Sequence, residues 1–220
     1  MVVPVYNEAT VVSAVVTEIL RTFPNVVCVN DGSADDSAAQ IAATGAHLVQ
    51  HPINLGQGAA LQTGLSYAKA RASGLYFVTF DSDGQHRVED ACSMLEVARS
   101  GVADVVLGSR FLNQRTEVPW LKRTVLRTVV TLSPTSRRLR LSDAHNGLRV
   151  LSRPVVEDLR ITMNDMAHAS EIIGYLGRST WRVREVPVTV NYTDYSKSKG
   201  QSLVNGVNIL FDLSMKQRRG

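Results

Sequence analysis

Short apolar runs alternate with helix-like segments over the first hundred residues, and this alternation restricts the fold more than any other feature. The runs predicted to be strands are Val2–Val5, Val26–Val29, Ala46–Val49, Leu75–Phe80 and Asp104–Gly108. The segments predicted to be helices are Ala9–Arg21, Asp35–Ala43, Ala59–Ala72 and Val88–Arg99. Strands that alternate with helices of this length form a parallel sheet with helices on both faces. We therefore predict an α/β fold in which ligands bind beyond the carboxyl ends of the strands.

After Gly108 the alternation is less regular, and the sequence predicts fewer elements there. Pro119–Leu132 and Leu203–Met215 are predicted helices, and Val183–Val190 is a predicted strand. The 220 residues are 44% hydrophobic and 20% charged and contain no repeat or linker, so we predict one domain, with residues 1–108 and 109–220 as its two halves. No run approaches the roughly 18 apolar residues that cross a bilayer. The abrupt start at Met1 leads us to expect that a few residues of the first strand, or a short leader, precede it.

An acidic pair follows one of the predicted strands. Asp81, Ser82 and Asp83 come directly after the run Leu75–Phe80. Two carboxylates at such a place can bind a hard divalent cation together with phosphate oxygens of a substrate. Asp, Ser and Gly are also the residues of ordinary turns, so the local sequence alone leaves a metal site and an acidic turn as equal alternatives.

Two further loops at predicted strand ends carry polar groups. Asp31 follows the second strand, where its carboxylate can accept hydrogen bonds from a nucleobase or a ribose, while Asp35 is predicted to cap the next helix. Asn54, Gly56 and Gly58 belong to a glycine-containing loop that opens a helix, and helix N-termini favour anions. This loop matches neither of the usual glycine-rich phosphate-binding motifs, so it is weak evidence on its own.

The net charge of +4 is unevenly distributed along the chain. Residues 110–140 contain eight Lys and Arg residues against Glu117 alone, which gives this stretch +7 and the rest of the chain −3. In the segment 115–140 apolar residues and Trp120 interleave with the cations, as in helices that lie on an anionic membrane surface. The alternative is a helix that packs on the domain core with its arginines in solvent. No nucleic-acid-binding motif accompanies this charge, and we expect no nucleic-acid partner.

Four ordered motifs together resemble the signature of glycosyltransferase family 2, above all its branch of dolichyl-phosphate and polyprenyl-phosphate sugar synthases. They are Val3–Glu8, Val29–Ser33, Asn54–Gly58 and Phe80–Gln85, and the later segments Gly108–Phe111, Asp143–Arg149 and Glu185–Val188 agree with the same family. The resemblance covers nearly the whole chain. It implies that residues 1–108 are the nucleotide-sugar-binding half of the domain, and that residues 109–220, with the basic amphipathic segment 115–140, are its acceptor-side half. It implies the GT-A fold, a Rossmann-like three-layer α/β/α sandwich with a mostly parallel central sheet. It also implies inverting transfer from a UDP- or GDP-linked sugar, with Mg²⁺ or Mn²⁺ as cofactor.

The same resemblance implies roles for individual residues. The residues expected at the nucleotide sugar are Pro4, Tyr6, Asn7, Glu8, Asp31, Asn54, Gly56, Gly58, Asp81, Ser82 and Arg110. Asp81 and Asp83 match the metal-binding DxD element, with Gln85 as a further ligand, which also makes Asp83 a catalytic residue. Residues expected to contact the acceptor or a phosphate are Arg149, Lys197 and Lys199. Asn146–Leu148 departs from the family's usual Ser-Gly-Phe, and residues 197–202 match its late motif only loosely, so the acceptor side is less well defined.

The acceptor decides whether the reaction needs a general base. A hydroxyl acceptor needs one, and Asp143 is the predicted base, with an N-cap or a salt bridge as its alternative role. A phosphate acceptor is already anionic and needs none. We expect a polyprenyl phosphate acceptor in glycan or cell-envelope polysaccharide synthesis. We also expect a cytoplasmic chain, alone or as a homo-oligomer, that lies peripherally on the membrane surface or on a membrane partner protein. Transfer to a saccharide, a sugar-phosphate nucleotidyltransferase and a non-catalytic nucleotide-sugar binder are the alternatives.

Overall fold

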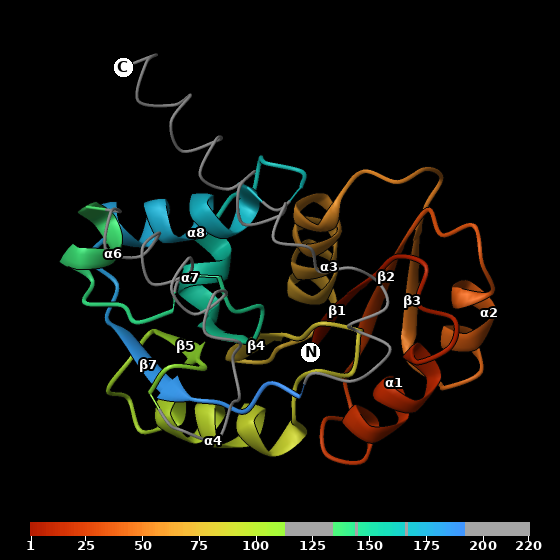
Figure 1. Cartoon of the computed structure of the whole chain (residues 1–220), viewed down its shortest axis with the longest axis horizontal. Coiled ribbons are helices and arrows are strands. Elements are labelled where there is room, and N and C mark those ends of the chain that lie inside the picture. Colours follow the sequence, from red (N-terminus) through yellow and green to blue (C-terminus); the bar gives the residue numbers. More distant parts are fainter. Residues whose placement is uncertain (113–133, 144, 166, 192–220) are drawn as a thin grey trace.

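The structure, a computed structural model, describes residues 1–112, 134–143, 145–165 and 167–191. In this part of the chain seven strands form one sheet in the order β3-β2-β1-β4-β6-β5-β7 (Figure 1). The strands are β1 (Val2–Val5), β2 (Val27–Asp31), β3 (His47–His51), β4 (Tyr76–Thr79), β5 (Val105–Ser109), β6 (Arg149–Ser152) and β7 (Val183–Pro187). The helices are α1 (Val12–Leu20), α2 (Ser37–Ala42), α3 (Gln57–Arg71), α4 (Val88–Arg99), α6 (Pro134–Arg138), α7 (Arg153–Asp158) and α8 (Ala167–Arg178).

The elements predicted over the first 108 residues are all present, with ends shifted by a few residues. β1, β2 and β3 pair in parallel, and β4 joins the other side of β1, also in parallel. The predicted strand Val183–Val190 is shorter and ends at Pro187. The predicted helices Pro119–Leu132 and Leu203–Met215, and the predicted site residues Lys197 and Lys199, lie outside the described residues.

Helices cover both faces of the sheet, which produces three layers. Along β1, Val2 packs with α3 on one face while Val3 and Val5 pack with α1 on the other, because successive side chains of a strand point to opposite faces. Strands buried on both faces read as continuous apolar runs. In Figure 1, α3, α7 and α8 lie above the sheet and α1 and α4 lie below it. The predicted three-layer, mostly parallel α/β fold is confirmed.

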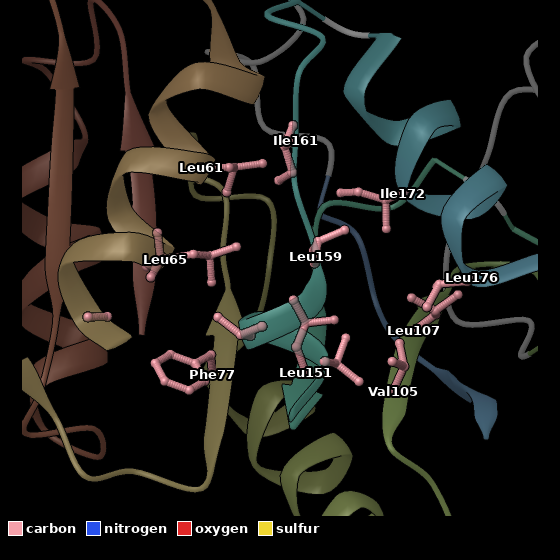
Figure 2. Packing of buried hydrophobic residues seen from close by; sticks show 14 of the residues in the cluster. Leu61, Leu65, Phe77, Val105, Leu107, Leu151, Leu159, Ile161, Ile172 and Leu176 are labelled. Atoms are coloured by element: carbon pink, nitrogen blue, oxygen red, sulfur yellow. The ribbon is translucent and has the colours of Figure 1, made fainter. Parts of the chain in front are cut away.

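The upper hydrophobic cluster joins the early and the late parts of the chain. Figure 2 shows Leu61 and Leu65 of α3 facing the same space as Phe77, Leu151 and residues of α8. Leu61 and Leu151 are 2% and 1% exposed, and Leu176 of α8 is 1% exposed. Burying a side chain of this size contributes about 1.5–3 kcal/mol, so the helices of the second half are held firmly on the sheet of the first.

The sequence did not predict β6, and this strand is what completes the site. It runs antiparallel between β4 and β5, with Thr79 opposite Arg149 on one side and Leu107 opposite Arg149 on the other. Because β6 is antiparallel, its first residue lies at the edge where β4 and β5 end. The segment was missed because Arg149 interrupts its apolar run.

None of the helices in the described ranges is both long enough and apolar enough to cross a membrane.

Candidate active site

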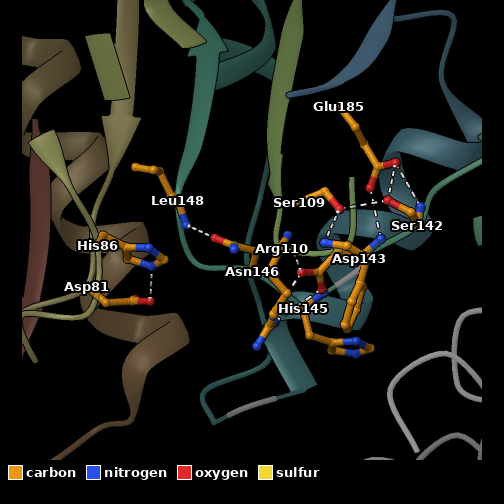
Figure 3. Close-up of polar contacts among 11 residues, drawn as sticks. Asp81, His86, Ser109, Arg110, Ser142, Asp143, His145, Asn146, Leu148 and Glu185 are labelled. Carbon is orange, nitrogen blue, oxygen red and sulfur yellow. Dashed lines mark hydrogen bonds and ion pairs between the residues drawn. The ribbon is translucent and has the colours of Figure 1, made fainter. Parts of the chain in front are cut away.

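Polar side chains from several strands meet at the edge of the sheet where the parallel strands end. Asp31 ends β2, Asp81 follows β4, Arg110 follows β5 and Arg149 begins β6. Figure 3 shows Asp81 with His86 on one side, and Arg110, Asp143 and Glu185 on the other. This is the edge at which open α/β sheets bind their ligands.

Asp81 is held by two hydrogen bonds and by a close backbone contact. Gln57 Nε2 lies 3.1 Å from Asp81 Oδ1, and His86 Nε2 lies 3.0 Å from Asp81 Oδ2. Gly147 packs directly on the carboxylate, since a Cβ on this residue would lie 2.0 Å from Oδ2. The Asp81 side chain is 27% exposed, so its oxygens can also reach a ligand. Burial raises the pKa of Asp81, but His86 and the charge of Arg149 outweigh it and hold the pKa below its ordinary value.

Asp83 lies in an excess of negative charge. Burial, and then the charges of Asp81 and Glu8, raise the pKa of Asp83 to about 6, although its Oδ1 accepts the N–H of Gln85 at 3.0 Å. Two carboxylates that repel each other at a sheet edge suit a divalent cation. Within the described ranges no group of three or more His, Cys, Asp or Glu residues is placed to bind a metal. The pair therefore fits an ion such as Mg²⁺, which takes one or two carboxylates and completes its shell with phosphate oxygens and water.

The other predicted members of this loop are buried. Ser82 is 7% exposed and Gln85 is 6% exposed. Nε2 of Gln85 has no hydrogen-bond partner among the residues that the structure describes. This nitrogen is a donor and cannot bind a cation, but it suits a phosphate oxygen.

Arg149 is the largest fully buried side chain in the described structure. It is 2% exposed, and its Nη1 has no hydrogen-bond partner in the described ranges. Burial lowers the pKa of Arg149, against the opposing charges of Asp81 and Asp143. A buried guanidinium nitrogen without a partner is costly, and an anionic ligand at this edge would satisfy it.

Asp143 forms an ion pair with Arg110, which is the alternative role that the sequence left open. Arg110 Nε lies 2.6 Å from Asp143 Oδ2 and Nη2 lies 3.2 Å from Oδ1, so the contact is bidentate. The Asp143 side chain is 1% exposed and that of Arg110 is 10% exposed. A carboxylate held in this way has no face toward an acceptor hydroxyl, and the geometry gives no support to Asp143 as a general base.

Asp31 is engaged within the protein rather than turned outward. It is 2% exposed, and its carboxylate contacts His51 Nδ1 at 2.7 Å and accepts the N–H groups of Leu55 at 2.9 Å and Gly56 at 2.8 Å. This carboxylate shapes the glycine loop in the structure, and its contact with a nucleobase stays a prediction. Asp35 accepts the N–H of Ser37, the first residue of α2, at 3.0 Å. The N-cap position itself is held by Asp36, whose side chain makes no capping hydrogen bond, so Asp35 lies one residue before the predicted place.

The glycine loop approaches a protein segment rather than open space. The N–H of Gly58 donates to Asn164 O at 2.6 Å, and a Cβ on Gly58 would lie 1.9 Å from Met163 O. The first turn of α3 is thus covered by the connection between α7 and α8. Part of its predicted anion-binding capacity is satisfied internally, which the sequence could not reveal because the partner lies about a hundred residues away.

The predicted nucleoside residues after β1 differ in exposure. Tyr6 is 47% exposed, whereas Glu8 is 8% exposed and Pro4 is buried within β1. Asn7 has a positive φ of 54°, and its Oδ1 accepts the N–H of Ala34 at 2.9 Å. Asn54 is exposed. Tyr6 and Asn54 are therefore the two exposed members of the predicted nucleotide-sugar set, while others such as Asn7 and Asp81 are partly buried.

Sequence reasoning missed four residues that the structure places in the site. Gln57 and His86 hold Asp81, Gly147 packs on it, and Glu185 binds the backbone at Asp143. All four lie in or beside segments of the family resemblance, but only the folded chain shows which side chains they meet.

Known proteins of similar sequence and structure transfer sugars. UDP-N-acetylglucosamine–dolichyl-phosphate N-acetylglucosaminyltransferase of Methanococcus voltae is 24% identical over 98% of this chain and 94% of its own length. Polyprenol monophosphomannose synthase of Mycolicibacterium smegmatis is 28% identical over 95% of this chain and 82% of its own length. Glucosyl-3-phosphoglycerate synthase from Mycobacterium tuberculosis, crystallised with Mn²⁺, uridine-diphosphate-glucose and phosphoglyceric acid, has a TM-score of 0.71 at 18% identity, over 95% of this chain and 76% of that one.

The structural likeness confirms the GT-A type of α/β fold that the sequence motifs implied. The model of the family described as glycosyl transferase family 2 matches residues 1–160. This match covers more than half of the chain and includes all the strands that carry Asp31, Asp81, Arg110 and Arg149. The chain therefore belongs to glycosyl transferase family 2.

Proposed function

We propose that this chain transfers a sugar, with inversion, from a nucleotide-diphosphate sugar to a polyprenyl phosphate during glycan or cell-envelope polysaccharide synthesis. The observation that carries the proposal is the charge arrangement at the edge of the sheet. Asp81 and Asp83 provide an acidic pair, and Arg149 provides a buried cation with an unsatisfied donor beside it. A metal-bound pyrophosphate brings both the cation and the anion that this arrangement requires.

The residues have distinct roles in this proposal. Asp81 and Asp83 would hold the metal, and Gln57 and His86 keep Asp81 in place. When bound, the metal supplies electrostatic stabilisation of the leaving diphosphate. Arg149 and Arg110 add fixed positive charge on the same edge, where preorganised donors lower the barrier as negative charge develops.

The ion pair of Asp143 favours a phosphate acceptor over a hydroxyl acceptor. A hydroxyl nucleophile needs a base within hydrogen-bond reach, and Asp143 is buried against Arg110. An anionic phosphate oxygen attacks without one. Dolichyl phosphate and polyprenol appear in the names of the two relatives, which further supports an acceptor of this class.

Exposed arginines support a position on the membrane surface. Arg137 and Arg138 of α6 and the nearby Arg140 are all exposed, and Ser142 and Asp143 of the site follow directly. Basic side chains near an anionic surface contribute about 1 kcal/mol each to binding. We infer that this side of the protein faces the cytoplasmic leaflet and brings the acceptor phosphate to the site.

The direct test measures nucleotide release from UDP-, GDP- and dTDP-linked sugars with Mn²⁺ or Mg²⁺, with and without a short-chain polyprenyl phosphate. We expect release with one donor and a strong dependence on the lipid phosphate. Asp83→Asn should nearly abolish release without loss of thermal stability, whereas Asp158→Asn, the same change on the surface of α7, should leave release unchanged. Full activity of Asp83→Asn would contradict the metal assignment. Nucleotide release that requires an oligosaccharide would show that the acceptor is a saccharide and not a lipid phosphate.

A further inference from the structure

Glu185 on the edge strand β7 accepts several donors from a segment 42 to 43 residues away. Its Oε2 accepts the N–H of Ser142 at 2.8 Å and the hydroxyl of Ser142 at 2.9 Å. Its Oε1 accepts the N–H of Asp143 at 2.9 Å. Burial raises the pKa of Glu185, while the N–H groups of Asp143 and Ser142 lower it. Both oxygens of this half-buried carboxylate thus accept hydrogen bonds from residues 142 and 143.

Asp143, whose backbone Glu185 binds, is also the ion-pair partner of Arg110. With both N–H groups fixed by Glu185, the Asp143 side chain makes its bidentate contact with the guanidinium. Asp143 Oδ2 also accepts the backbone N–H of Arg110 at 3.2 Å, and Ser142 Oγ lies 2.7 Å from Ser109 Oγ (Figure 3). The contacts form a continuous chain from β7 through residues 142 and 143 to the end of β5.

We propose that Glu185 is a positioning residue that sets the direction of the Arg110 guanidinium toward the donor diphosphate. This inference rests on the proposed function for the identity of the diphosphate. Glu is required because each of its two oxygens faces an N–H group. In Glu185→Gln one oxygen becomes an NH₂ donor opposite an N–H group. One hydrogen bond to the backbone of residues 142 and 143 is therefore lost, while the size of the side chain is kept.

The test is a double-mutant cycle between Glu185→Gln and Arg110→Lys. If Glu185 acts through Arg110, Glu185→Gln lowers kcat/KM for the donor roughly tenfold in the native background. In the Arg110→Lys background the same substitution then has little further effect, because linked residues are non-additive. Glu96→Gln, an exposed glutamate on α4 with the same charge change, is the matched control and should leave kcat/KM unchanged.

A second cycle on the free energy of urea unfolding does not depend on catalysis. Non-additivity in both cycles supports the proposal. Non-additive stability with unaffected or additive kinetics overturns the positioning role, and additivity in both cycles overturns the linkage itself. If the native protein releases no nucleotide from any donor, the proposed function fails, while the unfolding cycle still shows whether Glu185 and Arg110 are coupled.

Discussion

Replacing Arg149 by Met should make the ligand-free protein more stable and at the same time remove its activity. The guanidinium is 2% exposed and its Nη1 has no partner in the described structure, so the folded state bears a desolvation cost that a thioether of similar length does not. Exchange of a whole buried ion pair for apolar groups of similar volume is neutral or stabilises proteins by about 1–4 kcal/mol, whereas removal of one partner of a directly bonded pair destabilises them. Within the described ranges Arg149 forms no direct ion pair, so we take the first figure as the guide.

The stability gain expected for Arg149→Met depends on the two neighbouring carboxylates. Asp81 and Asp143 lose the attraction of one cation, but each keeps a directly bonded partner, His86 and Arg110 respectively. We therefore expect a gain of about 2 kcal/mol. One kcal/mol raises Tm by about 2–4 °C in a domain of this size, so the rise should be about 4–8 °C.

The assay is thermal and urea unfolding without ligands, followed by the same measurement with a nucleoside diphosphate and Mn²⁺. These ligands should raise the Tm of the native protein and have a much smaller effect on Arg149→Met. Arg153→Met is the matched control, because Arg153 donates to the carbonyl groups of Gly74 and Ala72. It should lose about 1–3 kcal/mol. A ligand-free Arg149→Met protein that is less stable than the native one would refute the reasoning.

Two further predictions concern stability away from the acidic pair. Burial lowers the pKa of His168 to about 4 from its ordinary 6.5, so the unfolded chain binds the proton first and stability falls as pH decreases from 6.5 toward 4. By pH 5 the free energy of unfolding is lower by about 2 kcal/mol. His168→Asn keeps a donor for Asp165 O, and its free energy of unfolding in urea titrations should depend correspondingly less on pH. An unchanged pH profile would exclude His168 as the source of the pH dependence. Gly58→Ala should destabilise by about 1–3 kcal/mol through overlap with Met163 O despite the better helix propensity of Ala. Gly74→Ala, where a Cβ would meet its nearest atom at 3.7 Å, should be close to neutral, and equal effects of the two substitutions would contradict the close approach.

Local sequence predicted the first part of the sheet because each strand there has a short apolar core and is separated from the next by a helix-like segment. Helix α4 was predicted with its observed bounds, Val88–Arg99, since its apolar spacing and its flanking residues agree. The strand β6 was missed because a buried arginine occupies its first position, and no rule of periodicity anticipates a buried cation in a central strand. Helix α8 was missed as well, although its buried residues have helical spacing.

The sequence predicted which residues belong to the candidate site better than it predicted which of them contact one another. The acidic pair was found because it follows a strand and stands in order with the other motifs of the family, whereas its local sequence alone fits an ordinary turn equally well. The ion pair of Asp143 with Arg110, and the hydrogen bond from the Asp143 backbone to Glu185, join residues far apart in sequence and depend on the order of the strands. The same holds for the glycine loop, where the N–H of Gly58 donates to Asn164 O.

The position of β6 determines how this chain can be divided. Residues 1–108 were predicted as one half of a single domain, yet they contain β4 and nearly all of β5 without the strand that lies between them. A fragment cut at that boundary would expose the unpaired edges of two central strands, and such edges promote aggregation. Chimeras or split-protein reporters built from this protein therefore have to keep Arg149–Ser152 together with residues 1–108.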